Sequence, residues 1–256
     1  MTIKYIVLLL YAVMIISIGI IGLRKTKSFG DFFLGGGKVG PWLSAFSYGT
    51  AYFSAVLFIG FAGKIGWGFG YSALWIAFFN ALVGVFAVWA LMGWRIKQIS
   101  TEYNISTMSE FLERRYESRY FKLFASLVIF IFMIPYSAAV FMGLSYLFTS
   151  NFNIDYSMAL ILMGIFTAFY LVLGGYKSMT MIDVVFGMIM SVGVIILYAS
   201  TVQKGGGHSA ITETLMSIEP KLIKAVGPPG LWSLFTLIFL TSVAPFAMPQ
   251  LVQKFY

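Results

Sequence analysis

The sequence predicts an all-α polytopic membrane protein with about seven transmembrane helices. Hydrophobic residues make up 60% of the 256 residues and charged residues only 10%, whereas soluble domains are nearer half apolar and a quarter charged. Uncharged apolar runs of about twenty residues recur along the chain, which is the length needed to cross about 30 Å of hydrocarbon. Helices are expected because an open strand in lipid would leave its backbone groups without hydrogen bonds.

The uncharged runs define the predicted spans in order along the chain. They cover residues 5–23, 41–63, 71–94, 123–149, 157–175, 184–203 and 231–252. The first run is too long for a signal peptide and lacks a clear cleavage site, so we expect it to remain as a helix. After the third run, the pattern Thr107-Met-Ser-Glu110 predicts a capping box that opens a short amphipathic helix at the membrane interface.

The basic residues predict the orientation in the membrane. The net charge is +8, and a basic chain of this kind suggests nucleic acid as a binding partner. Here the N-terminus and the loops after spans two, four and six contain five Lys and Arg residues, whereas the other loops contain twelve. The positive-inside rule accounts for this distribution without nucleic acid. We therefore predict a multi-pass protein of the cell membrane, surrounded by lipid, with its N-terminus outside.

Signals for enzyme chemistry are weak. The chain contains no cysteine, and its single histidine, His208, has no second ligand nearby, so no iron–sulfur, thiolate or histidine metal site is expected. Residues 35–40 match the letters of a dinucleotide-binding loop, but they lie between two spans without a preceding strand. No acidic residue falls inside a predicted span, which argues against a proton relay. Asp183, at the entry to span six, is expected to cap that helix.

Two spans have features of broken helices. Span two has Gly49 among small and hydroxyl residues, and span seven contains Pro245 and Pro249. Helices interrupted by Gly or Pro in corresponding positions of two halves point to a transporter binding site, where unwound carbonyls coordinate cations. Close packing through small residues is the alternative for span two. In span four, Pro135 predicts a kink, and Tyr136 could simply donate a hydrogen bond across the bundle.

Several stretches together resemble the sodium:solute symporter family. These stretches occur in the same order as in the family and extend over nearly the whole chain. They are residues 32–42 with 44–55, residues 107–116 (TMSEFLERRY), residues 173–178 leading to Asp183, and residues 249–255. The resemblance implies a leucine-transporter-type fold, with two inverted five-helix repeats and one extra N-terminal helix. It divides this chain into the extra helix and loop (1–40), the first five-helix repeat (41–203), and an outside loop with the first helix of an incomplete second repeat (204–256).

The resemblance also implies the site. The backbone carbonyls of Thr50 and Phe53 match sodium ligands of the broken helix, and the other ligands lie beyond residue 256. The residues implied for the substrate are Tyr52, Ser54, Tyr136, Pro249 and Gln250. Tyr52 replaces an aspartate of the proline-transporting members, which disfavours proline itself. Lys254 and Phe186 stand where the family more often has Arg and Gln.

We therefore expect sodium-coupled symport of a small organic solute, of the amino acid, vitamin or carboxylate class, by alternating access. The chain is expected to be a fragment whose partner is the missing C-terminal half of the same transporter. A seven-helix membrane receptor is the alternative, because the chain shows seven spans with an outside N-terminus.

Overall fold

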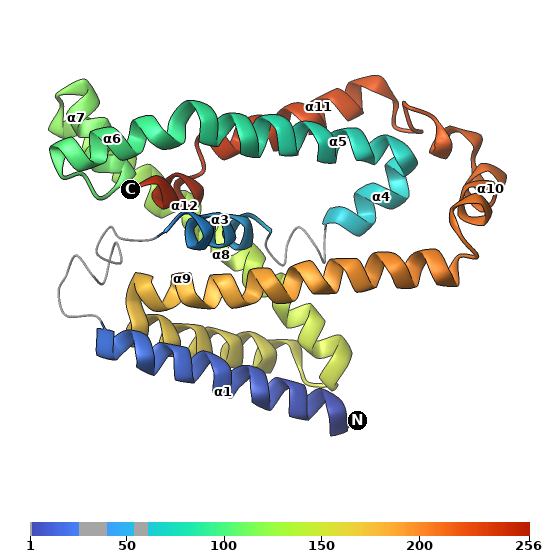
Figure 1. The fold of residues 1–256 in the computed structure, drawn as a ribbon, viewed down its shortest axis with the longest axis horizontal. Helices are drawn as coiled ribbons and strands as arrows, with labels where there is room; N and C mark the ends of the chain where they lie inside the picture. Colours follow the sequence, from blue (N-terminus) through green and yellow to red (C-terminus); the bar gives the residue numbers. More distant parts are fainter. Residues whose placement is uncertain (1, 26–39, 54–60) are drawn as a thin grey trace. The chain divides into compact units, whose positions relative to one another are not determined.

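The computed structural model of the chain describes residues 2–25, 40–53 and 61–256, and in this part every regular element is a helix (Figure 1). The chain divides into two compact units. The first comprises Met1–Ala55 and Tyr120–Met188, and the second comprises Val56–Arg119 and Ile189–Tyr256. The long helix α9 (Tyr156–Lys204) contributes its first part to one unit and its last part to the other.

The first unit contains α1 (Thr2–Lys25), α3 (Pro41–Tyr52), most of α8 (Arg119–Phe152) and the first part of α9. α1 packs closely on α9. The Ser178 hydroxyl donates a 3.3 Å hydrogen bond to the carbonyl of Ile18, and the rings of Tyr11 and Phe186 stack 5.6 Å apart. A Cβ at Gly22 would overlap the Ser178 hydroxyl. Small residues thus allow the two helices to approach closely.

A break at Gly175 divides α9 into two helical segments. Gly175 has φ 56° and ψ −162°, a conformation that glycine adopts without the steric cost of a side chain. The sequence predicted a connection of several residues between spans five and six. The structure instead resumes the helix directly after Gly175. Asp183 therefore lies well inside the second segment, and the expectation that it caps the helix N-terminus is wrong.

The second unit is built around an extended helical path. It runs through α4 (Gly63–Phe69), η3 (Gly70–Ser72), α5 (Ala73–Phe79), the π-helical segments η4 (Asn80–Ala87) and η5 (Trp89–Gly93), and α6 (Trp94–Tyr103). α11 (Gly230–Val243) lies beside α5 and η4 (Figure 1). Buried Phe69, Ile76 and Leu234 form the apolar contact between this path and α11.

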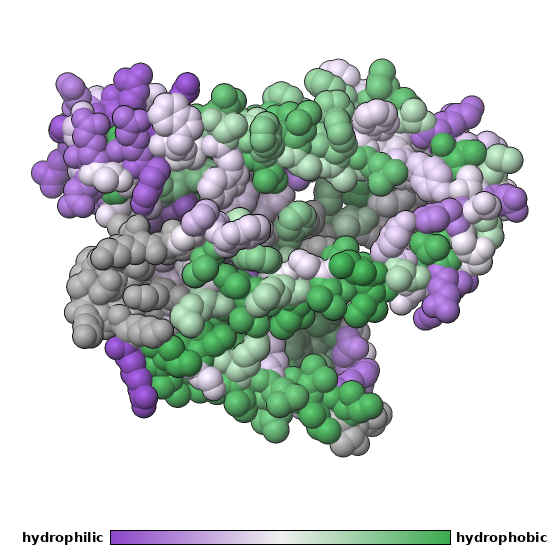
Figure 2. All heavy atoms as spheres, viewed as in Figure 1, coloured by the Kyte–Doolittle hydropathy of each residue, from purple (hydrophilic) through white to green (hydrophobic). Residues whose placement is uncertain are grey.

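Short helices complete the second unit. These are α7 (Met108–Tyr116), α10 (His208–Ile218), η6 (Pro220–Ile223), η7 (Ala244–Phe246), α12 (Pro249–Val252) and η8 (Gln253–Phe255). Figure 2 shows hydrophilic residues over α6 and α7 at one end of this unit and around α10 at the other, with apolar residues on the helices between. This distribution is typical of helices that cross a membrane between two aqueous ends.

Four described helices are long and apolar enough to cross a membrane: Ile3–Arg24, Gly63–Tyr103, Arg119–Phe152 and Ser178–Lys204. The pair Gly230–Phe246 and Pro249–Phe255, bent by 46°, makes a fifth if it is one span. Predicted spans two and five are represented by shorter helices, α3 and Tyr156–Phe169. That the chain has seven membrane spans therefore stays a prediction.

Candidate functional site

The helix of predicted span two ends in the middle of that span. α3 begins with Pro41 at its first position, where a missing N–H costs nothing, and ends at Tyr52. Phe53 leaves the helix with φ −80° and ψ 75°, while its N–H still donates a 2.8 Å hydrogen bond to the Gly49 carbonyl. The sequence placed the departure from helical geometry at Gly49. The structure keeps Gly49 helical, so that position was wrong, and the helix ends three residues later, at Tyr52.

Hydroxyl groups hold the end of α3 against α9. The Thr50 hydroxyl lies 2.8 Å from the carbonyl oxygens of both Phe46 and Asp183, so these two acceptors share its one proton. The buried Ser47 hydroxyl donates a 2.5 Å hydrogen bond to the Asp183 carboxylate. A bond to an ionised carboxylate is shorter and stronger than one between neutral groups. Asp183 thus positions the last turn of α3 through both its side chain and its backbone.

A glycine on α9 allows this close approach. A Cβ at Gly187 would lie 2.7 Å from the Phe46 ring and 3.1 Å from the Thr50 hydroxyl. The first of these distances is shorter than any normal van der Waals contact, so an alanine would push α3 away from α9. Gly49, on α3 itself, shows nothing within 4 Å of the same position. The glycine that matters for this contact is therefore Gly187.

The Asp183 charge also acts on a tyrosine at the break in α9. Burial of Tyr176 raises the pKa of its phenol from 10.0 to about 12, and the negative charge of Asp183 contributes to the same increase. A hydrogen bond with Thr180 acts in the opposite direction. Tyr176 therefore stays a neutral phenol at physiological pH and does not add a second negative charge beside Asp183.

The second broken helix lies in the other unit, where α11 gives way to η7 and α12. Pro245 has no N–H, so it cannot donate to the carbonyl of Thr241 one turn earlier. The Asn80 side-chain amide donates to that carbonyl instead, at 2.7 Å. Gly84 leaves room for the contact, since a Cβ there would lie 3.2 Å from the Thr241 oxygen and 3.3 Å from Pro245.

Sequence reasoning missed the contact that Asn80 makes at this bend. The available signal was a lone amide side chain within an apolar run of predicted span three. A polar group in such a run needs a hydrogen-bond partner inside the protein, because the hydrocarbon offers none. Asn80 is also the first residue of the π-helical segment η4, and π-helical turns occur frequently at functional sites.

The predicted capping box lies beside the end of the bent helix in the second unit. Thr107 accepts a 3.2 Å bond from the Glu110 N–H, and the Glu110 carboxylate accepts a 2.8 Å bond from the Ser106 N–H. The first bond confirms Thr107 as the N-cap of α7, while the Glu110 side chain accepts from the residue before the N-cap rather than from Thr107 itself, so the second bond of a capping box is displaced by one residue. The Gln253 amide then donates to the Ser106 carbonyl at 2.9 Å, which ties the last helical turns to the loop before α7.

The residues implied for the substrate are distributed over both units. Tyr52 is half-buried at the end of α3, with its ring 5.4 Å from that of Phe53. Tyr136 is half-buried in α8 directly after Pro135. Pro249 and Gln250 open α12, which begins after the bend. Ser54 lies outside the described residues.

Comparison with known proteins decides the family. The family described as "Sodium:solute symporter family" matches residues 32–252. The chain belongs to the sodium:solute symporter family. This confirms the resemblance seen in the sequence, and the receptor alternative is not supported.

Two curated members of the family show how much of a symporter the chain covers. The sodium/pantothenate symporter of Escherichia coli (strain K12) is 28% identical over 241 residues, which are 92% of this chain and 48% of the relative. The sodium/proline symporter of Salmonella typhimurium (strain LT2) is 32% identical over 215 residues, 82% of this chain and 42% of the relative. The chain spans about half the length of the curated relatives it matches.

A solved structure shows the same fold. A Na⁺-coupled sialic acid symporter in a substrate-bound, outward-open state superposes with a TM-score of 0.79 over 98% of this chain and 52% of that chain. The two sequences are 20% identical over this match. The multi-pass, all-helical architecture is therefore that of a sodium:solute symporter.

Proposed function

We propose that this chain forms part of a transporter that couples the entry of sodium to the uptake of a small organic solute. The observation that carries the proposal is the anchored end of α3. In a member of this symporter family, a helix that stops at Tyr52 places the Thr50 carbonyl in its last turn, and carbonyls of a last turn generally lie beyond the regular hydrogen bonds of the helix. Carbonyl oxygens of this kind are ligands for a small hard cation.

Sodium is proposed to bind at the Thr50 and Phe53 carbonyls and to favour the outward-open state. Substrate then binds at residues implied by the family resemblance, and rocking of the helices releases both to the cytoplasm. Those residues are Tyr52, Ser54, Tyr136, Pro249 and Gln250. Each sodium ion that enters gains about 2.3 kcal/mol per 100 mV of inside-negative potential, which drives accumulation of the solute.

The proposed substrate is an organic carboxylate. The relatives and the solved symporter are named for pantothenate, proline and sialic acid, and each of these solutes carries a carboxyl group. Tyr52 occupies the position where proline carriers have an aspartate, so a solute other than proline is expected.

We also propose the division into an extra helix and loop (1–40), a first repeat (41–203) and the start of a second repeat (204–256), with the N-terminus outside.

Uptake measurements on two samples test this proposal. One is the purified chain of residues 1–256 in vesicles, and the other is the completed transporter, meaning this chain together with the half that its relatives have beyond the match. A panel of labelled carboxylates is offered under an inward sodium gradient, with potassium as the control. We expect sodium-dependent uptake by the completed transporter only. Uptake by residues 1–256 alone would overturn the fragment proposal, and uptake by neither sample would overturn the proposed function.

A further inference from the structure

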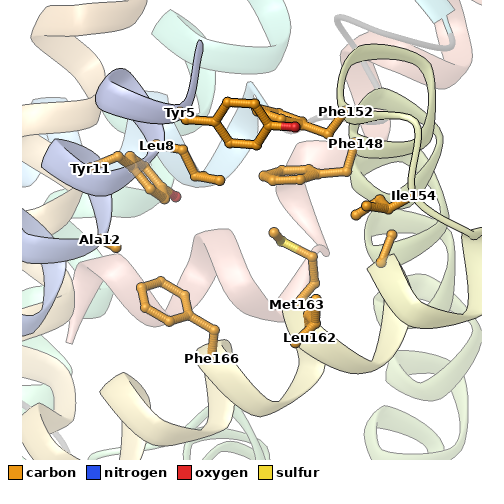
Figure 3. A pocket seen from close by; sticks show the side chains of 11 residues that line it. Tyr5, Leu8, Tyr11, Ala12, Phe148, Phe152, Ile154, Leu162, Met163 and Phe166 are labelled. Carbon is orange, nitrogen blue, oxygen red and sulfur yellow. The ribbon is translucent and has the colours of Figure 1, made fainter. Parts of the chain in front are cut away.

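An apolar pocket of about 340 Å³ lies in the first unit, where α1 meets the end of α8 and the start of α9 (Figure 3). Leu8 and Ala12 of α1, Phe148 of α8, and Met163 and Phe166 of α9 face it from three sides. Every side chain that lines it is aliphatic, aromatic or a methionine, and none is charged. Its volume falls at the lower end of the range of ligand pockets, about 300–1,000 Å³. The occupant must therefore be small in cross-section and apolar.

The pocket lies within helices that cross the membrane. Both Ile3–Arg24 and Arg119–Phe152 are apolar enough to span it. Two lining residues, Tyr5 and Leu162, remain 55% and 52% exposed, so the pocket is open at its side rather than enclosed. Ala12 follows Lys4 by eight residues, which at 1.5 Å per residue corresponds to a depth of about 12 Å. This depth suits the upper part of a lipid acyl chain.

Lys4 places a positive charge at the end of the pocket that is nearest the start of α1. The Lys4 ammonium lies 3.3 Å from the backbone carbonyl of Asn151 and 3.4 Å from its side-chain oxygen. The residues that follow these two, Tyr5 and Phe152, line the pocket with their rings 5.5 Å apart. Lys4 is exposed and its ammonium has three donors, so it can bind an oxygen anion in addition to Asn151.

We propose that this pocket binds one acyl chain of a membrane phospholipid whose phosphate group pairs with Lys4. Apolar side chains contact the tail, and the ammonium at the pocket end is complementary to the phosphate at the head. Lysines near the headgroup level attract lipid phosphates in this way, while their stems remain in the apolar layer. This proposal concerns α1, α8 and α9 alone and does not depend on the proposed transport activity.

Photochemical labelling tests the proposal. The 256-residue chain is placed in phospholipid vesicles that contain a phosphatidylglycerol probe with a photoreactive group on one acyl chain, and labelled peptides are mapped after illumination. We expect labelling of residues 2–25 and 156–169 that saturates as the probe concentration rises. Lys4→Gln should raise the probe concentration for half-saturation about fivefold, the loss expected for one interfacial charge.

Variants that fill the pocket provide the decisive comparison. Ala12→Trp and Met163→Trp place bulk in the pocket from two different helices, so the test survives if one variant fails to fold. Both should abolish the saturable labelling. Ile195→Trp, at a side chain that is 67% exposed on the later part of α9, is the matched control and should leave it unchanged. Labelling that rises linearly with probe concentration and is the same in the pocket variants as in the wild-type chain would overturn the proposal. Lipid that surrounds the protein without a specific site gives this linear, unsaturated labelling.

Two further outcomes would also overturn it. A diacylglycerol, which has the acyl chains but no charged group, would show that Lys4 does not select the headgroup if it competed as strongly as the phospholipid. Absence of labelling in the completed transporter, with labelling in residues 1–256, would show that a protein segment fills the pocket in the whole molecule.

Discussion

The side-chain amide of Asn80 donates a 2.7 Å hydrogen bond to the carbonyl oxygen of Thr241. Pro245, one turn later, has no N–H to donate to this carbonyl. A proline inside a membrane helix is tolerated when a neighbouring group satisfies the backbone that it frees. Here the neighbouring group comes from a helix 161 residues away in the sequence. The bend between α11 and α12 is thereby supported at its origin.

This relationship predicts a coupling between Asn80 and Pro245. Asn80→Leu removes the donor and should destabilise the chain by about 1–3 kcal/mol, the cost of a buried acceptor without its partner. Pro245→Ala restores an N–H one turn after Thr241, so the same Asn80→Leu change should cost much less in that background. Thermal unfolding of the four proteins in detergent measures the coupling, which is expected to exceed about 0.5 kcal/mol.

Asn80→Gln serves as the control for that cycle, because it keeps an amide donor. It should lie between the wild-type chain and Asn80→Leu in stability. An equal cost of Asn80→Leu in the wild-type chain and in the Pro245→Ala variant would show that the hydrogen bond does not compensate for the proline.

The contact between Ser47 and Asp183 predicts an effect on sodium. Ser47→Ala removes the 2.5 Å bond to the carboxylate that helps to hold the end of α3. If sodium binds there, the sodium concentration for half-maximal uptake by the completed transporter should rise five- to thirtyfold, which corresponds to about 1–2 kcal/mol. Ser44→Ala, one turn earlier on α3, is the matched control and should leave this concentration unchanged. If Ser47→Ala and Ser44→Ala require the same sodium concentration for half-maximal uptake, the contact with Asp183 does not contribute to the sodium site.

Two glycine variants should behave oppositely. Gly187→Ala brings a Cβ within 2.7 Å of the Phe46 ring and should lower both thermal stability and apparent sodium affinity. Gly49→Ala meets nothing within 4 Å and lies inside a helix, so it should raise helix stability by about 0.5–1 kcal/mol and leave sodium affinity unchanged. Uptake normalised to the amount of protein at the surface, together with unfolding temperature, distinguishes them. A lower apparent sodium affinity in Gly49→Ala would contradict this expectation and would show that Gly49 itself is needed for the break in the helix.

Membrane orientation is testable because the chain contains no native cysteine. Thr101→Cys in α6 and Ser209→Cys in α10 are both exposed positions on opposite sides of the predicted membrane. An impermeant thiol reagent added to intact cells should label Ser209→Cys only, and Thr101→Cys should react after the cells are opened. The reverse pattern would contradict the N-out orientation.

Local features of this protein could be predicted from the sequence because each depends on a short window of residues. Apolar runs locate the long helices, since the hydrocarbon thickness dictates their length. The pattern of Thr107 and Glu110 predicts a helix start that the structure confirms at Thr107, because the bond from the Glu110 N–H to the Thr107 hydroxyl closes within one turn. Proline at position 245 indicates a bend in span seven because its ring and missing N–H act on the preceding turn.

Contacts between distant segments were decided only by the tertiary structure. Ser47 and Asp183 are 136 residues apart, and their hydrogen bond depends on which faces of α3 and α9 meet. In a membrane both faces of a helix can be apolar, so hydrophobic periodicity does not distinguish the face that packs on protein from the face that contacts lipid. Asp183 looked like a helix cap because the sequence predicted a connection before span six, and the break was placed at Gly49 because glycine tolerates non-helical backbone angles. Side-chain partners across helices, which no local pattern pairs, decide which polar groups hold these helices together.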